Sequence, residues 1–386
     1  MPTKTSNHTT TAATFALAMA LSGIITLPAT VNAQQQPAPG APTPGYTRVQ
    51  GQDTGALPLP AVSGLRALID HREEMRKLIQ GISNYGRQQK NGFMVIARDA
   101  EELIIKRDLQ DDKIISPART FMRSIDAIMY DGVFLGHKVI GQAPPPEYQT
   151  QMLENIERAK LSGLTILTLD FATQPQSIDA IYKAARARGL IAAVAPHSTA
   201  NLTEIPPYPR RPSAENSNNI LALNDVKNFV YLSDPAAFGR QDQFALKIHD
   251  TNFDLIIVDP FSGREPLSQQ AVQTLKYKKL GARRLVFARM DVGTAARYRY
   301  YWKEDWKEGS PSWIANPYPG DPDRHFVEYW NPEWQNLMFG SPQSYVFGLI
   351  KQGYDGVLLE GLRNYLVFEG NVEIEQEFAP LADAPK

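Results

Sequence analysis

The amino-acid sequence predicts an α/β fold, a single-domain (β/α)8 barrel, and two observations support this prediction. One local pattern recurs along residues 62–373: an amphipathic basic helix ends at a glycine, and a short apolar strand follows. The strands are continuous runs of valine, isoleucine and leucine, which is typical of parallel strands that are covered on both faces. Eight such units in about 300 residues fit a closed barrel of this class.

Eight segments are expected as the barrel strands, with helices between them, for example over residues 149–160 and 269–279. The strand segments are residues 93–97, 125–135, 164–171, 190–195, 228–232, 255–258, 285–290 and 356–359. Four of them follow a glycine that can end a helix in the left-handed conformation. These glycines are Gly163, Gly189, Gly281 and Gly353. An open, doubly wound sheet is the alternative, but no G-x-G-x-x-G motif follows a strand.

The 386-residue chain has the composition of a globular protein, with 43% hydrophobic residues, 21% charged residues and a formal net charge of -1. This near-neutral charge, without a basic block or zinc-finger spacing, gives no reason to expect nucleic-acid binding. The chain has no cysteine, which excludes disulfides, thiolate metal sites and a cysteine nucleophile. The motifs lead us to expect no cofactor and no metal.

Residues 1–33 have the pattern of a secretory signal peptide. Lys4 is the only charged residue before the apolar run 12–27, and Val31-Asn32-Ala33 resembles a cleavage site. A membrane anchor is the alternative, but a spanning helix needs about 20 apolar residues, and this run is shorter. We therefore expect a bacterial protein that is cleaved near Ala33, is secreted or periplasmic, and is not membrane-bound after cleavage.

The rest of the chain divides into three parts. Residues 34–61 are rich in proline and glutamine without apolar periodicity, so we expect a disordered linker. Residues 62–373 form the barrel domain, and residues 374–386 are expected as a weakly ordered tail. The oligomeric state stays open.

Charged residues stand where most of the predicted strands end, and active sites of (β/α)8 barrels lie at the carboxyl ends of the strands. These residues are Arg98, Asp99, Asp131, Asp170, His197, Asp234, Asp259, Asp291 and Glu360. Each alone is commonly a helix cap or an ion-pair partner. Carboxylates gathered at one mouth raise one another's pKa, however, and this can turn one of them into a general acid.

All five tryptophans lie within one segment of the chain, with several tyrosines among them. They are Trp302, Trp306, Trp313, Trp330 and Trp334. Two interpretations are open: a packed core over one end of the barrel, and a surface on which sugar rings stack. Helical spacing over residues 294–307 predicts a helix with Tyr298, Tyr301, Trp302 and Trp306 on one face, which favours core for that stripe.

Several motifs in the second half resemble one known family. They are residues 298–302 (YRYYW), Trp306, residues 311–313 (PSW), 329–335 (YWNPEWQ), 353–357 (GYDGV), 254–259 (DLIIVD) and 228–232 (NFVYL). In order and spacing over residues 226–370, they resemble the barrel family that includes endo-α-1,4-polygalactosaminidases, glycoside hydrolase family 114. Residues 90–205 also resemble family segments, but out of their usual order, which would make this chain a circularly permuted barrel.

The resemblance implies glycoside hydrolysis of an amino-sugar polysaccharide by paired carboxylates. Asp259 and Glu360 are the leading pair, and Asp291 is a third candidate. The residues expected to bind substrate are Asp131, Asp170, Arg98, Tyr298, Tyr301, Trp302 and Trp330. An acidic groove would suit a cationic, partly deacetylated galactosamine chain.

Two departures from the family pattern bear on activity. The family has Ser-Ile-Gly-Glu-Ala-Glu where this chain has residues 291–296 (DVGTAA), so Thr294 replaces an expected catalytic glutamate. Glu360 stands where the family strand ends in aspartate, which keeps the charge. A carbohydrate-binding barrel without catalysis is therefore a second hypothesis. A metal-assisted hydrolase is a third, supported by His197 and the acidic mouth alone, because the histidines show no ligand spacing.

Overall fold

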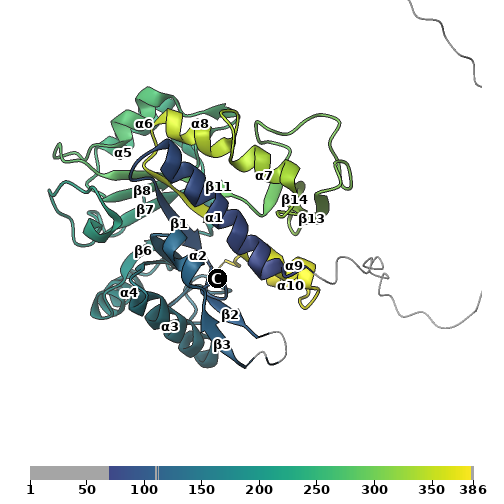
Figure 1. The fold of residues 1–386 in the computed structure, drawn as a ribbon. Coiled ribbons are helices and arrows are strands. Elements are labelled where there is room, and N and C mark those ends of the chain that lie inside the picture. The colour runs from purple at the N-terminus through teal and green to yellow at the C-terminus, as the bar shows by residue number, and fades with distance from the viewer. Residues whose placement is uncertain (1–68, 109–110, 112, 384–386) are drawn as a thin grey trace, which may run out of the picture. The chain divides into compact units, whose positions relative to one another are not determined.

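Eight parallel strands form a nearly closed barrel with helices on its outside in the structure, a computed structural model that describes residues 69–108, 111 and 113–383 (Figure 1). The barrel strands are β1 (Met94–Arg98), β4 (Ala127–Asp131), β5 (Thr165–Phe171), β6 (Ile191–Ala195), β7 (Phe229–Leu232), β8 (Leu255–Val258), β11 (Leu285–Asp291) and β15 (Gly356–Glu360). All eight expected strands are present, which confirms the predicted barrel of parallel strands. The expected signal peptide and linker lie outside the described residues.

The strands follow one another around the barrel in the order of the chain. β1 pairs with β4, β4 with β5 and β5 with β6, while β7 pairs with β8, β8 with β11 and β11 with β15. The first strand pairs with the last, with Met94 beside Gly356. Among the described barrel strands, β6 and β7 are the one neighbouring pair that no ladder of hydrogen bonds joins. The doubly wound alternative is wrong, because that sheet needs a reversal of strand order.

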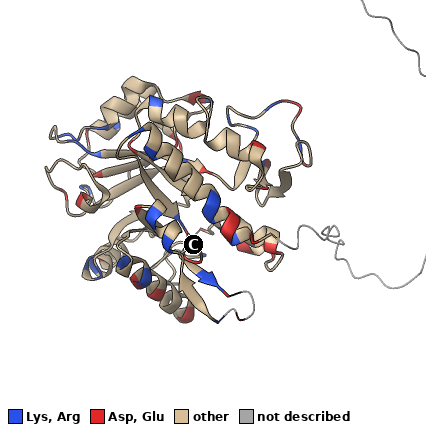
Figure 2. Ribbon diagram, viewed as in Figure 1, with Lys and Arg blue, Asp and Glu red and all other residues tan. Residues whose placement is uncertain are grey.

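Ten α-helices are described in this part of the chain. They are α1 (His71–Gln89), α2 (Arg119–Ser124), α3 (Pro146–Leu161), α4 (Pro175–Ala187), α5 (Gln241–His249), α6 (Gln269–Leu275), α7 (Pro332–Met338), α8 (Tyr345–Gln352), α9 (Tyr365–Glu369) and α10 (Ile374–Glu377). The Asp70 side chain caps α1 by accepting from the Glu73 amide, as a good N-cap residue does. None of the described helices is long and apolar enough to cross a membrane. Figure 2 shows basic and acidic residues close together along α1, where Arg76 pairs with Glu73.

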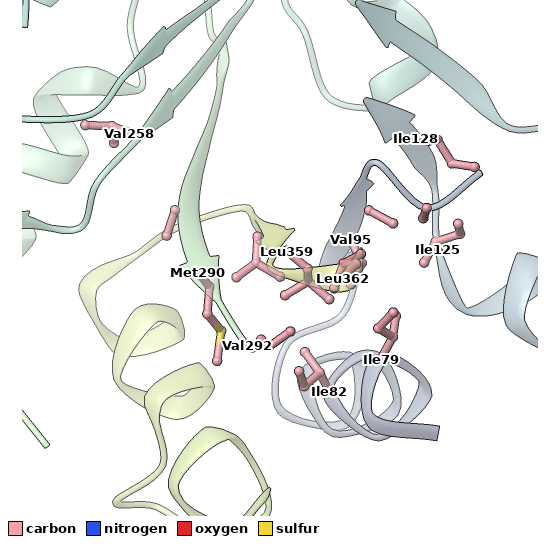
Figure 3. Packing of buried hydrophobic residues seen from close by; sticks show 14 of the residues in the cluster. Ile79, Ile82, Val95, Ile125, Ile128, Val258, Met290, Val292, Leu359 and Leu362 are labelled. Atoms are coloured by element: carbon pink, nitrogen blue, oxygen red, sulfur yellow. The ribbon is translucent and has the colours of Figure 1, made fainter. Parts of the chain in front are cut away.

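Two apolar layers hold the barrel together, one inside it and one between the strands and the helices. Val95, Met290 and Leu359 lie in the outer layer, where they face Ile79 and Ile82 of α1 (Figure 3). The inner layer holds the alternate residues of the same strands, which are Ile96, Met129, Leu167, Leu169, Phe171, Tyr231, Ile257, Phe287 and Leu358. Side chains alternate along a strand, so the layer to which one residue belongs shows whether the next residues of that strand point into the barrel or toward the helices.

Glycine ends helices as predicted at three of the four expected positions. Gly163 and Gly189 follow α3 and α4 with φ values of 84° and 67°, and Gly353 caps α8 with φ 106°. Gly281 is also left-handed, at φ 81°, but α6 ends earlier, at Leu275, so this glycine belongs to a turn beyond the helix.

The expected helix over residues 294–307 is absent, and this prediction was wrong. Residues Thr294–Ala296 form strand β12, which pairs antiparallel with β14 (Asp321–Val327), and β14 pairs with β13 (Ile314–Tyr318). Thr294 lies opposite Phe326, so bonds to a distant strand replace the local bonds of a helix. The remaining short strands pair as β2 (Ile105–Arg107) with β3 (Ile115–Pro117), and β9 (Phe261–Ser262) with β10 (Glu265–Pro266).

Candidate active site

Charged and polar side chains at the carboxyl ends of the strands point into the mouth of the barrel. Strand alternation decides which residues do so, because a residue two positions after an interior apolar residue faces the interior as well. Glu360, for example, follows the interior residue Leu358 in β15. By this rule the mouth contains Arg98, Asp131, Tyr231, Asp259, Arg289, Asp291 and Glu360.

Glu360 is held by three donors. Its Oε1 accepts hydrogen bonds from Arg98 Nη1 at 2.6 Å and from Tyr231 Oη at 2.5 Å, and its Oε2 accepts from Arg289 Nε at 3.1 Å. The side chain is 7% exposed. Burial alone would raise the pKa of Glu360, but the charges of Arg289 and Arg98 and their hydrogen bonds outweigh burial and lower the pKa to about 2. Glu360 is therefore ionised at physiological pH.

Asp131 shares Arg98 with Glu360, but its pKa moves in the opposite direction. Its Oδ1 accepts from Arg98 Nε at 3.3 Å, and its Oδ2 accepts from Arg98 Nη2. Burial raises the pKa of Asp131 to about 7, and the carboxylates of Asp99 and Glu360 add to this rise against the charge of Arg98. Arg98 also lies 3.6 Å from Asp99, so one guanidinium serves three carboxylates.

Asp259 is held by Arg299 in a bidentate ion pair. Arg299 Nη1 donates to Asp259 Oδ1 at 2.9 Å, and Nη2 donates to Oδ2 at 2.6 Å. The Phe261 amide donates to Oδ1 at 3.0 Å, and Arg289 Nη1 lies 3.8 Å from Oδ2. Because Arg289 also bonds Glu360, this single guanidinium lies between the two carboxylates that were expected to act together.

The mouth is close to electrically neutral, and not strongly acidic as the strand ends suggested. The connected ion pairs around Arg98 and Arg289 join three arginines to four carboxylates, which leaves a formal charge of -1 if all are ionised, and Asp291 lies outside this group and pairs with Arg324 at 3.8 Å. The groups are Arg98, Arg289 and Arg299 against Asp99, Asp131, Asp259 and Glu360. The excess negative charge falls on the side of Asp131, where Asp99 adopts a left-handed backbone with φ 52°.

Asp291 closes a turn with Thr294. Its Oδ1 accepts from the amides of Gly293 and Thr294 at 3.0 and 2.9 Å, and its Oδ2 accepts from Thr294 Oγ1 at 2.6 Å. These bonds start β12 and occupy both oxygens of the carboxylate. The structure therefore gives a local structural role to Asp291, the third catalytic candidate, and to Thr294.

Asp170 does not lie in the mouth. It stands between the interior residues Leu169 and Phe171, so its side chain points outward into the layer under the helices, where it is 0% exposed. Its Oδ1 accepts from the amides of Phe134 and Leu135 at 2.6 and 3.0 Å. Burial raises the pKa of Asp170 to about 7. This carboxyl group anchors the loop after β4, and the expectation that it binds substrate is not supported.

Tyr298 and Tyr301 lie in the turn after β12 with different surroundings. Tyr298 is 42% exposed and donates from Oη to Asp321 Oδ2 at 3.1 Å. Tyr301 packs edge-on against the buried Trp334, with 5.6 Å between ring centroids. Tyr298 is therefore open to a ligand, whereas Tyr301 belongs to the packed aromatic core.

Trp302 and Trp330 were also expected to bind substrate, and both rings pack against other aromatic side chains. The Trp302 ring stacks on His325 at 5.7 Å between centroids and stays partly exposed. Trp330 lies 4.8 Å from the ring of His71 in α1 and 4.8 Å from Phe368 in α9. Trp330 therefore packs against the rings of α1 and α9.

Sequence reasoning missed three members of the network: Arg289, Arg299 and Tyr231. Tyr231 and Arg289 were detectable, because each continues the interior alternation of an expected strand. Arg299 had no such signal, since it lies in a turn and reaches Asp259 over 40 positions of sequence. Two other expected strand-end residues lie elsewhere: His197 is exposed in the loop after β6, and Asp234 caps a short 3-10 helix, Pro235–Phe238.

Two surface hollows lie at the opposite end of the barrel, where the strands begin. Gly92, Met94 and Leu164 line one of them, and Leu164, Leu190 and Ile191 line the other. Neither includes a residue of the ion-pair network. Within the described residues, no three histidine, aspartate or glutamate side chains are grouped so that they could hold a metal ion.

Comparison with known proteins finds partial relatives and no matching family model. An uncharacterised protein of Methanocaldococcus jannaschii is 31% identical over 149 residues, which is 38% of this chain and 40% of that protein. Uncharacterised proteins of Deinococcus radiodurans and Thermotoga maritima are 31% identical over 118 residues and 27% identical over 128 residues, covering 31% and 33% of this chain and 36% and 38% of those proteins. The matches thus span about two fifths or less of each relative.

Proposed function

We propose that this protein is an exported glycoside hydrolase that cleaves an amino-sugar polysaccharide, with Glu360 as the ionised carboxylate and Asp131 as the proton donor. One observation carries the proposal: two carboxylates in the barrel mouth share Arg98, and their pKa values move apart, to about 2 and about 7. Glycosidases need one carboxyl group in each state.

Glu360 is suited to the charged role. It stays ionised because two arginines and a tyrosine bond its oxygens, so it stabilises positive charge on the sugar ring or attacks the anomeric carbon. Asp131 is suited to the acidic role, because its carboxyl is partly protonated near pH 7 and is 22% exposed, within reach of a substrate. It would pass its proton to the oxygen of the leaving sugar, and water would then release the product.

Asp259 takes a supporting role in this proposal. Its bidentate pair with Arg299 and its contact with Arg289 hold the arginine that bonds Glu360 Oε2. Charge-assisted bonds of this kind fix geometry as well as charge. The pair predicted from the sequence, Asp259 with Glu360, thus becomes Asp131 with Glu360.

The substrate class follows from the family resemblance and from the charge of the mouth. With Asp131 protonated, the partly exposed carboxylate of Asp99 carries the negative charge on this side of the mouth, where it would attract the ammonium group of a deacetylated galactosamine. Tyr298 offers an exposed ring near Arg299, at 5.7 Å from its guanidinium carbon, for the apolar face of a sugar.

The test is release of reducing ends from partly deacetylated galactosamine polymers. Glu360→Gln and Asp131→Asn should each lower the rate at least 100-fold, and Asp259→Asn should lower it less, because general acids and nucleophiles contribute more than supporting groups. Asp250→Asn, at an exposed site, is the control. Parental rates in both Glu360→Gln and Asp131→Asn would overturn the proposal.

A carbohydrate-binding barrel without turnover is the second candidate, and a specific observation favours it. Thr294 stands at the glutamate position of the family pattern, and its hydroxyl is committed to Asp291 at 2.6 Å. This candidate predicts that the parent binds the polymer in a pull-down on insoluble galactosamine polymer while releasing no reducing ends.

A further inference from the structure

The carboxyl-terminal segment, residues 374–382, lies against the mouth of the barrel. Its Phe378 ring contacts the rings of Tyr318 and Phe326 in the β13–β14 hairpin, with centroids 5.9 and 5.2 Å apart. Glu377 forms an ion pair with Arg363, which follows β15. Leu381 packs against the apolar cluster inside the barrel. The sequence led us to expect a weakly ordered tail here, so these contacts are a finding of the structure.

The far end of the segment is tied to the loop after β4. The Ala382 amide donates to the Lys138 carbonyl at 3.0 Å, and the Ile140 amide donates to the Ala382 carbonyl at 3.0 Å. Val139 and Ala382 thereby form a parallel bridge. The segment thus connects Arg363, which follows β15, with the loop around Val139, which follows β4.

Glu360 ends β15 and Asp131 ends β4, and β1, which carries Arg98, lies between these two strands. The segment therefore spans the strand ends that hold the proposed catalytic pair. Tyr318 gives a second sign of this closeness. Burial raises the pKa of Tyr318, and the charges of Asp291 and Glu360 add to the rise.

The segment is held by few contacts for its length. Every residue from 371 to 383 is partly or fully exposed, and α10 has only one turn. Among the described residues, its contacts include one ion pair, one aromatic cluster, one leucine and two backbone hydrogen bonds. Segments with few buried apolar contacts open at low free-energy cost, well below that of global unfolding.

We propose that residues 374–382 are a displaceable strap over the catalytic mouth, and that a polysaccharide chain takes the place of the strap when it binds. The departure of Phe378 would expose the part of the Tyr318 ring that it covers, while the Arg324 guanidinium, 3.5 Å from the ring centroid, stays on one face. The Lys138 carbonyl and the Ile140 amide would be free to bond sugar hydroxyls. The identity of the ligand rests on the proposed function, whereas the movement of the strap does not.

The absence of cysteine makes a direct test possible, because an introduced pair has no competing thiol. Val139→Cys combined with Ala382→Cys places two cysteines at the parallel bridge, where a disulfide would lock the strap. Val139→Cys and Ala382→Cys alone are the matched controls. Hydroxyl-radical labelling with mass spectrometry then reads the exposure of Tyr318 in the oxidised and the reduced protein, with the exposed Tyr277 as internal standard.

Reduction of the disulfide should raise Tyr318 labelling at least threefold, and a chain that ends at Glu373 should show labelling at or above that of the reduced protein. Equal labelling of Tyr318 in the locked, reduced and shortened proteins would overturn the strap. The shortened chain keeps the test decisive if the double variant folds poorly, and far-ultraviolet circular dichroism checks its fold.

Polymer binding separates the two proposals. The locked protein should bind partly deacetylated galactosamine polymer at least tenfold more weakly than the reduced protein. If labelling responds to the lock and the reduced protein neither binds nor cleaves the polymer, the strap stands and the proposed substrate fails. Equal binding by the locked and reduced proteins would overturn displacement of the strap by the polymer.

Discussion

Arg98 and Glu360 join the first and the last strand of the barrel through one ion pair, with 2.6 Å between Nη1 and Oε1. The same arginine bonds Asp131 on the neighbouring strand β4. The contact that helps to close the barrel is therefore also the centre of the proposed active site. A change at either residue should affect stability and function together, and the measurements below are chosen to tell the two apart.

Glu360→Gln should destabilise the fold at pH 7 and not near pH 2. The pKa of Glu360 is lowered in the folded state, so its contribution is present above the unfolded value near 4.5 and is lost as the pH falls toward 2. A shift of this size corresponds to about 3 kcal/mol. Urea unfolding at pH 7 and at pH 2 measures the difference, with Glu154→Gln on the exposed face of α3 as the control. An equal loss at both pH values would contradict the charge pairing.

Thr294→Glu should destabilise the protein and should not raise the rate of hydrolysis. Thr294 is buried, so a glutamate there loses the bond to Asp291 and places a second carboxylate beside it, at a cost of about 2–3 kcal/mol. Thr294→Val is the matched variant, since it removes the hydroxyl alone. A gain of activity in Thr294→Glu would mean that the acid belongs at this position and not at Asp131.

Trp334→Ala and Tyr298→Ala should separate the two roles of the aromatic residues. Trp334 is fully buried and its Nε1 donates to the Val292 carbonyl at 3.0 Å, so its loss should cost about 3–5 kcal/mol of stability. Tyr298→Ala should leave the melting temperature within about 2 °C, because surface changes are small in energy, and should weaken polymer binding several-fold. Thermal unfolding and a binding isotherm check both. Unchanged binding in Tyr298→Ala would remove this ring from the proposed groove.

Export is testable without any substrate. Expression in a bacterial host with a tag after Lys386 should place the protein in the periplasm or medium, with an amino terminus at Gln34. Amino-terminal sequencing of the secreted protein measures this directly. A full-length protein that stays in the cytoplasm would contradict the signal-peptide prediction, and Ala33→Arg provides a control in which cleavage should fail.

The barrel could be predicted from the sequence because its signals are local. Strands such as 255–258 are unbroken apolar runs, and Gly353 marks the end of the helix before β15. Chain order then brings Arg98, Asp131 and Glu360 to one end without further information, since carboxyl ends of parallel strands meet there. The prediction that Asp170 binds substrate in the mouth overlooked this alternation, because Asp170 lies between the interior residues Leu169 and Phe171 and therefore points outward.

Other parts could not be predicted, because they depend on contacts between distant segments. Residues 294–307 have helical spacing, yet pairing of Thr294 with Phe326 makes the segment a strand and a turn. The neutralisation of Asp259 by Arg299 has the same origin, because that turn brings the arginine back over the mouth. The path of residues 374–382 likewise depends on Phe326 and Ile140, which lie far away in sequence.

The most direct test of the central claim is a carbon-13 NMR titration of the side-chain carboxyl groups of Asp131 and Glu360, assigned with Asp131→Asn and Glu360→Gln. We predict that the Asp131 signal titrates near pH 7 while the Glu360 signal does not change between pH 4 and pH 9. An Asp131 carboxyl that is already ionised at pH 4 would contradict its role as the proton donor.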